Sequence, residues 1–171
     1  PPRSTLFPYT TLFRSYENTR DVDEIATYGL LYNWYACEDE LGLCPDGWHV
    51  PTDEEWTTLV TYLDNGDNAF DPNGTGTNGV VGGRLKETNT LHWAFPNRFA
   101  DNSSGFTALP GGFRDAYKGV FQYKTFVCRY HSNTLYASMY PIGRLISTDF
   151  AGITKFTSSK ATGQSVRCIQ D

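Results

Sequence analysis

The amino-acid sequence predicts a single, loop-rich α+β domain. Residues 52–63 carry the period and the capping residues of a helix, whereas short runs typical of antiparallel strands follow residue 117. A helix that comes early and strands that come late are typical of α+β architecture and not of a doubly wound parallel sheet. The chain has 171 residues, 15% of them aromatic, which suffices for one core and fits the ~100 to 200 residues of one domain.

The first regular element is expected at residues 27–36. Residues 16–27 are polar and charged without a sustained period, which indicates a surface loop. In the segment TYGLLYNWYA that follows, large apolar side chains alternate on both faces. This is the pattern of a strand buried on both sides, so we expect a central strand here.

The clearest helix signal lies in residues 52–63. Thr52 can cap the free amides at the helix start, and Glu55 can reach back to the Thr52 amide. A stripe of apolar residues follows at helical spacing, formed by Trp56, Leu59, Val60 and Leu63. Such a stripe is expected to face the core, and the helix is expected to end near Asn65–Gly66.

The rest of the chain is predicted to consist of loops and small strands. Residues 64–83 are too rich in Gly, Asn and Asp for a helix or strand interior, so a long loop is expected there. Beyond Tyr117, turn signals separate short apolar runs, as expected of antiparallel strands. These runs are GVFQYKTFVCRYH, TLYASMYPIG, RLISTDF and GITKFT.

The composition excludes two classes of partner. The net charge is −5 and no basic cluster is present to neutralise phosphates, so nucleic acid is not an expected partner. No apolar run approaches the ~20 residues that span a bilayer, so membrane insertion is not expected either.

The first fifteen residues are interpreted separately. Residues 5–15 read TLFPYTTLFRS, which is the translation of a common sequencing adapter, and residues 1–15 are therefore interpreted as an adapter-derived artefact. The alternative is an edge strand, because the apolar residues of this segment could alternate across a sheet. Residues 16–171 are predicted to form the domain.

Three segments together resemble the Fibrobacter succinogenes major paralogous domain, a family of exported bacterial domains. They are YGLLYNWYA at 28–36, LCPDGWHVPTDEEWTTL at 43–59, and SGFTALPGGFR at 104–114 followed by the final SVRCIQD. The HVPTDEEW stretch is also similar to a segment of the formylglycine-generating enzymes. The resemblance implies a C-type-lectin-like, formylglycine-generating-enzyme-like fold. It also implies that strands ahead of residue 28 are missing, so that the domain is truncated at its N-terminus.

The four cysteines favour disulfides over zinc, since the chain has no CxxC pair. The resemblance implies a bond between Cys44 and Cys168, which lie in two of the matched motifs. Cys37 and Cys128 are then either a second disulfide or two free thiols.

The enzymes in this superfamily bind copper between two closely spaced cysteines, and this implies a rival hypothesis of a cysteine oxidase. Here Cys128 has no second thiol nearby, and His131 is expected to be incidental. Calcium-dependent sugar binding lacks its acidic motif at residues 95–97, and DPNGTG at 71–76 lacks the ligands of a calcium loop. We therefore expect no catalysis, no metal and no cofactor. His49 is expected to be structural, and the four tryptophans, Trp34, Trp48, Trp56 and Trp93, are expected to lie in the core.

The segment 115–162 departs most from the family pattern. The departure has three explanations: a reading-frame error, divergence, or a hypervariable display surface like that of the variable proteins of diversity-generating retroelements. The third predicts a ligand-binding surface rich in Tyr and Arg, which offer large contact area with a polar handle. Its members would be Tyr117, Tyr123, Arg129, Tyr130, Tyr136, Tyr140 and Arg144. Packing of the sheet by the same tyrosines is the alternative.

Together these observations predict a non-catalytic binding module of the cell surface, periplasm or extracellular space. Its ligand is expected to be an extracellular polymer or protein, held by the C-terminal strands and loops. The remaining alternatives are a variable ligand-display protein, a cysteine oxidase, and a purely structural domain of surface proteins.

Overall fold

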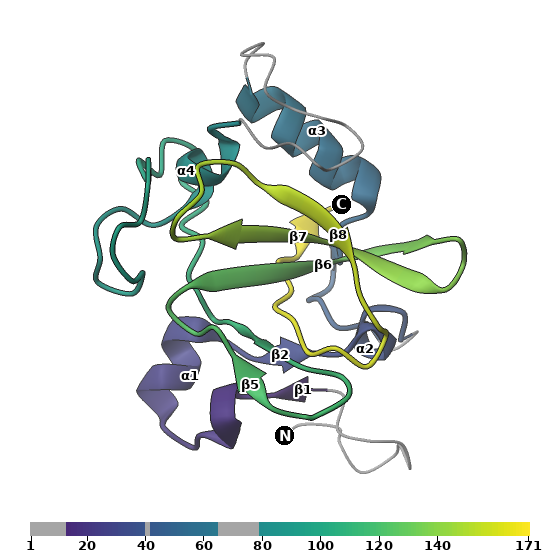
Figure 1. Cartoon of the computed structure of the whole chain (residues 1–171). Helices are drawn as coiled ribbons and strands as arrows, with labels where there is room; N and C mark the ends of the chain where they lie inside the picture. Colours follow the sequence, from purple (N-terminus) through teal and green to yellow (C-terminus); the bar gives the residue numbers. More distant parts are fainter. Residues whose placement is uncertain (1–12, 40–41, 65–78) are drawn as a thin grey trace.

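The computed structural model describes residues 13–39, 42–64 and 79–171, and it has a mixed α+β architecture. Its largest sheet is antiparallel, with strand order β6-β7-β8, from β6 (Val127–Tyr136), β7 (Tyr140–Ser147) and β8 (Thr154–Thr157). In Figure 1 this sheet occupies the middle of the molecule, with helices above it and further helices and strands below it. Those above are α3 (Asp53–Asp64) and α4 (Val81–Leu85), and those below include α1 (Val22–Tyr28), β1 (Phe13–Arg14), β2 (Leu31–Tyr32) and β5 (Phe121–Gln122). The prediction of an α+β domain with short antiparallel strands is confirmed.

Three two-stranded antiparallel pairs complete the strands of the described residues. They are β1 (Phe13–Arg14) with β2 (Leu31–Tyr32), β3 (Trp48–His49) with β9 (Ile169–Gln170), and β4 (Phe113–Arg114) with β5 (Phe121–Gln122). Residues 1–12 of the segment interpreted as adapter-derived lie outside the described residues, and that interpretation stays a prediction.

The late runs form antiparallel strands as predicted, but their boundaries differ: the first run contains β5 and the start of β6, and β7 extends from the second run into the third. The run TLYASMYPIG spans the β6–β7 turn, so that Tyr136 ends β6 and pairs with Tyr140 at the start of β7. The turn residues Ala137 and Ser138 have φ angles of 49° and 59°. These positive φ values reverse the chain where the sequence carries no glycine to mark the turn.

The prediction for residues 16–36 is wrong. A 3-10 turn (Tyr16–Asn18) and helix α1 (Val22–Tyr28) replace the expected loop, and only β2 remains of the expected central strand, with the one-turn helix α2 (Trp34–Cys37) after it. Side-chain caps explain both helices: Asp21 accepts from two amides at the start of α1, and Asn33 accepts from the Ala36 amide in α2.

Helix α3 (Asp53–Asp64) begins as predicted. The Glu55 carboxylate accepts from the Thr52 amide at 2.8 Å, and the Thr52 hydroxyl accepts from the Glu55 amide at 3.2 Å. The predicted stripe faces the main core cluster, where Trp56 and Val60 are buried beside Val81, Leu85, Trp93 and Ile146. The expected end near Asn65–Gly66 falls at the border of the described residues.

Helix α4 (Val81–Leu85) begins inside the expected loop 64–83, and that part of the prediction is wrong. Two glycines permit its close packing. A Cβ on Gly82 would lie 1.9 Å from the carbonyl oxygen of Gly152, and one on Gly83 would lie 2.2 Å from that of Phe99. Glycine is therefore needed at these two positions because other backbone segments pack closely against the helix, and not because the chain turns there. The DPNGTG segment at 71–76 lies outside the described residues.

Candidate functional site

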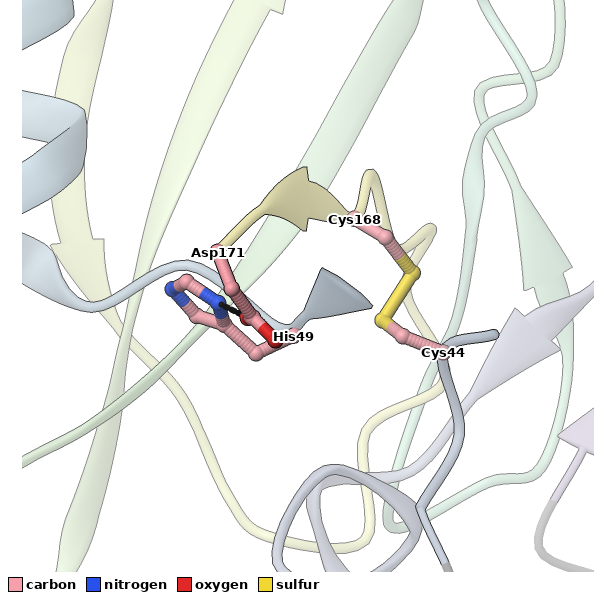
Figure 2. Close-up of a disulfide and its surroundings, with 4 residues drawn as sticks. All are labelled: Cys44, His49, Cys168 and Asp171. Atoms are coloured by element: carbon pink, nitrogen blue, oxygen red, sulfur yellow. Dashed lines mark hydrogen bonds and ion pairs between the residues drawn. A yellow bond between two sulfur atoms is a disulfide. The ribbon is translucent and has the colours of Figure 1, made fainter. Parts of the chain in front are cut away.

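A disulfide joins Cys44, which precedes β3, to Cys168, which precedes β9 (Figure 2). The Cα atoms are 5.9 Å apart and the two residues are separated by 124 positions in the sequence. This confirms the pairing that the family resemblance implied. Next to the bond, β3 and β9 pair with Trp48 opposite Gln170 and His49 opposite Ile169.

His49 links this strand pair to helix α3. Its Nδ1 lies 2.6 Å from Asp171 Oδ1, as Figure 2 shows, and its Nε2 lies 2.9 Å from Glu55 Oε1. The hydrogen bonds to Asp171 and Glu55 raise the pKa of the imidazole above its usual value. The charged ring can donate to both carboxylates at once, so His49 has the structural role that the sequence predicted.

A pocket of about 250 Å³ lies between α3 and β9, beside the disulfide. Its wall is mainly apolar and includes the side chains of Trp48, Trp56, Leu59, Phe106 and Ile169. The expectation that every tryptophan lies in the core is wrong for Trp48, which is 44% exposed. Trp48 lies in the two-residue strand β3, which pairs only with β9 and is not part of the main sheet. Its indole therefore lies at the surface.

Two charged residues line the pocket, Glu55 and Arg167. The Glu55 carboxylate is already engaged by His49 and by the amide and hydroxyl of Thr52. The Arg167 guanidinium lies 4.7 Å from the centre of the Phe106 ring and donates to the Phe106 carbonyl at 3.1 Å. No carboxylate of the described residues pairs with Arg167.

The residues predicted to form a Tyr- and Arg-rich surface do not come together at one place. Tyr136 and Tyr140 lie at the tip of the β6–β7 hairpin and are 62% and 47% exposed. Tyr117 and Tyr123 flank β5 and are 92% and 59% exposed. Figure 1 shows the hairpin tip and β5 at different ends of the molecule.

Tyr130 and Arg144 are buried, so the expectation that they lie on an exposed surface is wrong. The Tyr130 ring packs against Trp56 and Phe106 in the main core cluster. Arg144, opposite Tyr130 on β7, forms an ion pair with Asp53 at the start of α3 at 2.7 Å. Both side chains leave the sheet on its α3 face, where the core lies.

Arg129 points to the opposite face of the sheet and is half-buried. Its guanidinium lies 3.5 Å from the centre of the Phe113 ring and 5.1 Å from that of Phe156. The Phe113 ring in turn stacks on Tyr123. Arg129 therefore supports an aromatic stack and is not freely displayed.

Cys37 and Cys128 are free and buried in two separate clusters, so the second disulfide is not formed. Burial raises the pKa of each thiol to about 12. Thiols in this state are poor nucleophiles and poor metal ligands at neutral pH. His131, three residues after Cys128, is fully buried and hydrogen bonded to the Tyr32 carbonyl at 2.9 Å.

The described residues contain no group of three or more His, Cys, Asp or Glu side chains that could hold a metal ion. Within the same residues, no helix is both long and apolar enough to cross a bilayer. The pocket residues Phe106, Arg167 and Ile169 were not predicted as site residues. The Cys44–Cys168 pairing was the signal that could have found part of this site, since it brings the segment of Trp48 beside the segment of Ile169.

The fold and this site define a small, disulfide-linked α+β domain with an apolar surface pocket. The chain belongs to the Fibrobacter succinogenes major domain family, whose model matches residues 8–170. The match begins eight residues before the range over which the resemblance was predicted. No curated protein and no solved structure matches the chain.

Proposed function

We propose that this domain is a non-catalytic, exported binding module that holds an apolar side chain of an extracellular protein in the pocket between α3 and β9. The observation that carries the proposal is an apolar pocket of about 250 Å³ with the half-exposed indole of Trp48 at its wall. Exposed apolar surface next to a cavity marks interaction sites more often than random surface does.

The size and lining of the pocket favour one side chain over a larger ligand. Pockets for small molecules usually measure ~300 to 1,000 Å³, and this one measures about 250 Å³. A sugar unit also needs several convergent polar groups. Glu55, which could supply them, has both carboxylate oxygens engaged within the protein. A protein partner therefore fits this site better than a polysaccharide does.

The wall of the pocket is held in place before any ligand binds. The Cys44–Cys168 bond, the β3–β9 pairing and the His49 bridge all fix β9 against the segment that leads into α3. A pre-organised site loses less conformational freedom on binding. The hydroxyl of Thr52 and the carboxylate of Glu55 thus serve the pocket as well as the helix start.

The proposed location outside the cytoplasm rests on the disulfide, because such bonds persist in oxidising compartments. The proposed C-type-lectin-like fold rests on the resemblance of the sequence motifs to that superfamily. The oxidase alternative finds little support in a Cys128 thiol that is fully buried, with its pKa raised to about 12. The open apolar pocket favours a binding module over a purely structural domain, because such pockets are the usual sites of ligand binding.

Titration of the ¹⁵N-labelled protein with N-acetyl amino-acid amides tests the proposal. N-acetyl-phenylalaninamide and N-acetyl-leucinamide are expected to shift the Trp48 indole and Ile169 amide signals. Half-saturation is expected in the millimolar range, because ~15 heavy atoms at ~0.3 kcal/mol each correspond to a millimolar Kd. N-acetyl-serinamide is expected to leave the same signals unchanged.

Two variants serve as the matched pair. Trp48→Ala removes a wall of the pocket and is expected to abolish the ligand-induced shift of the Ile169 amide signal. Tyr62→Ala replaces a side chain of α3 that is 80% exposed and is expected to preserve this shift. Thermal melting of both variants checks that they fold. Equal shifts with the serine and phenylalanine probes, or none with any amide, would refute the proposal. If cellohexaose shifts the Trp48 and Ile169 signals and none of the amides does, a polysaccharide ligand is favoured instead.

A further inference from the structure

We propose that the natural ligand presents a carboxylate together with its apolar side chain, and that Arg167 binds this carboxylate at the mouth of the pocket. The inference rests on the proposed function and specifies the ligand class as the C-terminal apolar residue of a protein. In such a residue the side chain and the α-carboxylate are attached to the same carbon. Both groups can then reach one pocket and its rim together.

The charges that line the pocket are unequally satisfied. The Glu55 carboxylate accepts from Thr52 at 2.8 and 2.9 Å and faces His49 at 2.9 Å. Arg167 has no carboxylate partner among the described residues and uses one N–H for the Phe106 carbonyl. A guanidinium has five N–H donors, so most of those on Arg167 are free to bind a ligand. The unpaired charge of the pocket is therefore positive.

This local charge opposes that of the whole chain, which is −5. A general electrostatic attraction would favour basic ligands, so a preference for an acid must come from Arg167 itself. Three other basic side chains are paired with carboxylates: Arg144 and Lys155 with Asp53, and Lys124 with Glu24. Arg129 also lacks a carboxylate partner within the part of the chain that the structure describes, but its guanidinium lies against two aromatic rings.

Arg167 is held for this role from both ends. Its backbone precedes Cys168, which the disulfide fixes, and its guanidinium lies on the Phe106 ring at 4.7 Å. Phe106 itself lines the pocket. An apolar group inside the pocket would therefore lie beside Phe106, and a carboxylate attached to it would lie next to the guanidinium. Planar guanidinium and carboxylate groups can pair through two hydrogen bonds.

Paired probes test the inference directly. N-acetyl-phenylalanine, with a free carboxylate at pH 7, is compared with N-acetyl-phenylalaninamide by NMR titration of the Trp48 and Ile169 signals. The acid is expected to bind roughly tenfold more tightly, as expected for a charge-assisted hydrogen bond at a partly exposed site. The leucine pair is expected to show the same preference, and added NaCl is expected to reduce it.

The Arg167→Gln variant keeps a hydrogen-bond donor and is expected to bind acid and amide equally, while Arg167→Lys is expected to keep part of the preference. Arg98→Gln, which removes the same charge from an exposed position outside the pocket, is expected to behave as the wild type. Equal affinity for acid and amide in the wild type would overturn the inference and leave the proposed function intact. Failure of both probes would overturn the proposed function.

Discussion

His131 makes a sharp prediction about stability in mild acid. The ring is fully buried in β6, where Nε2 lies 2.9 Å from the Tyr32 carbonyl and Nδ1 faces the side-chain amide nitrogen of Gln164 at 3.4 Å. A carbonyl oxygen can only accept, so Nε2 carries the hydrogen and Nδ1 accepts from Gln164. These partners fit the neutral imidazole, and burial lowers the pKa of His131 to about 4.

The size and sign of the effect follow from linkage. The unfolded chain binds a proton at His131 near pH 6.5, whereas the folded protein binds it only near pH 4. As the pH falls from 6.5 to 4, protons therefore favour the unfolded state by ~1.4 kcal/mol per pH unit. The predicted loss in the free energy of unfolding is about 3 kcal/mol over the whole window.

Other titrating groups act outside most of this window. The pKa values of Asp53 and Glu55 are lowered in the folded protein, so their stabilisation is lost mainly below the ordinary carboxyl range. The pKa of His49 is raised, so its stabilisation is complete below pH 6.5 and is lost only as the pH rises through its folded-state pKa. The interval between about pH 6.5 and 4.5 thus reports on His131.

Urea unfolding at several pH values from 6.5 to 4.5 measures the effect, with His131→Gln as the comparison. The wild type is expected to lose about 2 to 3 kcal/mol across the interval. The variant starts from a lower stability but is expected to show a much flatter pH dependence. Parallel curves for the two proteins would refute the reasoning, because the pH dependence would then arise elsewhere.

Three further changes test the packing. Replacing Cys44 and Cys168 by Ala together is expected to lower the free energy of unfolding by ~5 kcal/mol in the chain-entropy model, since the bond spans 124 positions; a loss below ~1 kcal/mol in urea titration would contradict this. Gly82→Ala would normally favour a helix, but the added Cβ would overlap the Gly152 carbonyl. A lower Tm is therefore expected, and an unchanged Tm would be inconsistent with this contact. Lys86→Met removes the hydrogen-bond donor of three carbonyl groups. It is expected to lower the free energy of unfolding in urea by ~3 kcal/mol or more. Wild-type stability in this variant would show that these hydrogen bonds do not stabilise the fold.

The sequence predicted best those elements whose signals are local. Helix α3 carries its capping box and its apolar stripe within thirteen residues, 52–64, and both function as expected. The segment 27–36 has an equally regular alternation but forms only β2 and the one-turn α2. Distant partners hold α2: the Trp34 amide donates to Lys160, and its indole donates to Ser132. No local pattern reports such contacts.

The site was predictable only in part for the same reason. Alternation along β6 separates Arg129 from Tyr130, but it does not tell which face α3 will cover. The structure places Tyr130 and Arg144 on the covered face. The pocket joins residues near positions 48, 106 and 167. The disulfide and the β3–β9 pairing bring the first and the last together, and Phe106 reaches them through its contacts with Arg167 and Trp56. The disulfide was predictable from motif resemblance, and Trp48 with Ile169 could have been inferred from it.

The β6–β7 hairpin offers a place to graft foreign sequence onto this scaffold. Its β6 arm is anchored at the base, because the Asn133 amide donates to the Pro51 carbonyl and the Thr134 hydroxyl accepts from the Asp53 amide. Beyond Leu135, which packs against the second core cluster, the turn projects away from the body of the molecule (Figure 1). A peptide inserted at Ser138 would be presented on a firm stem without disturbing either core.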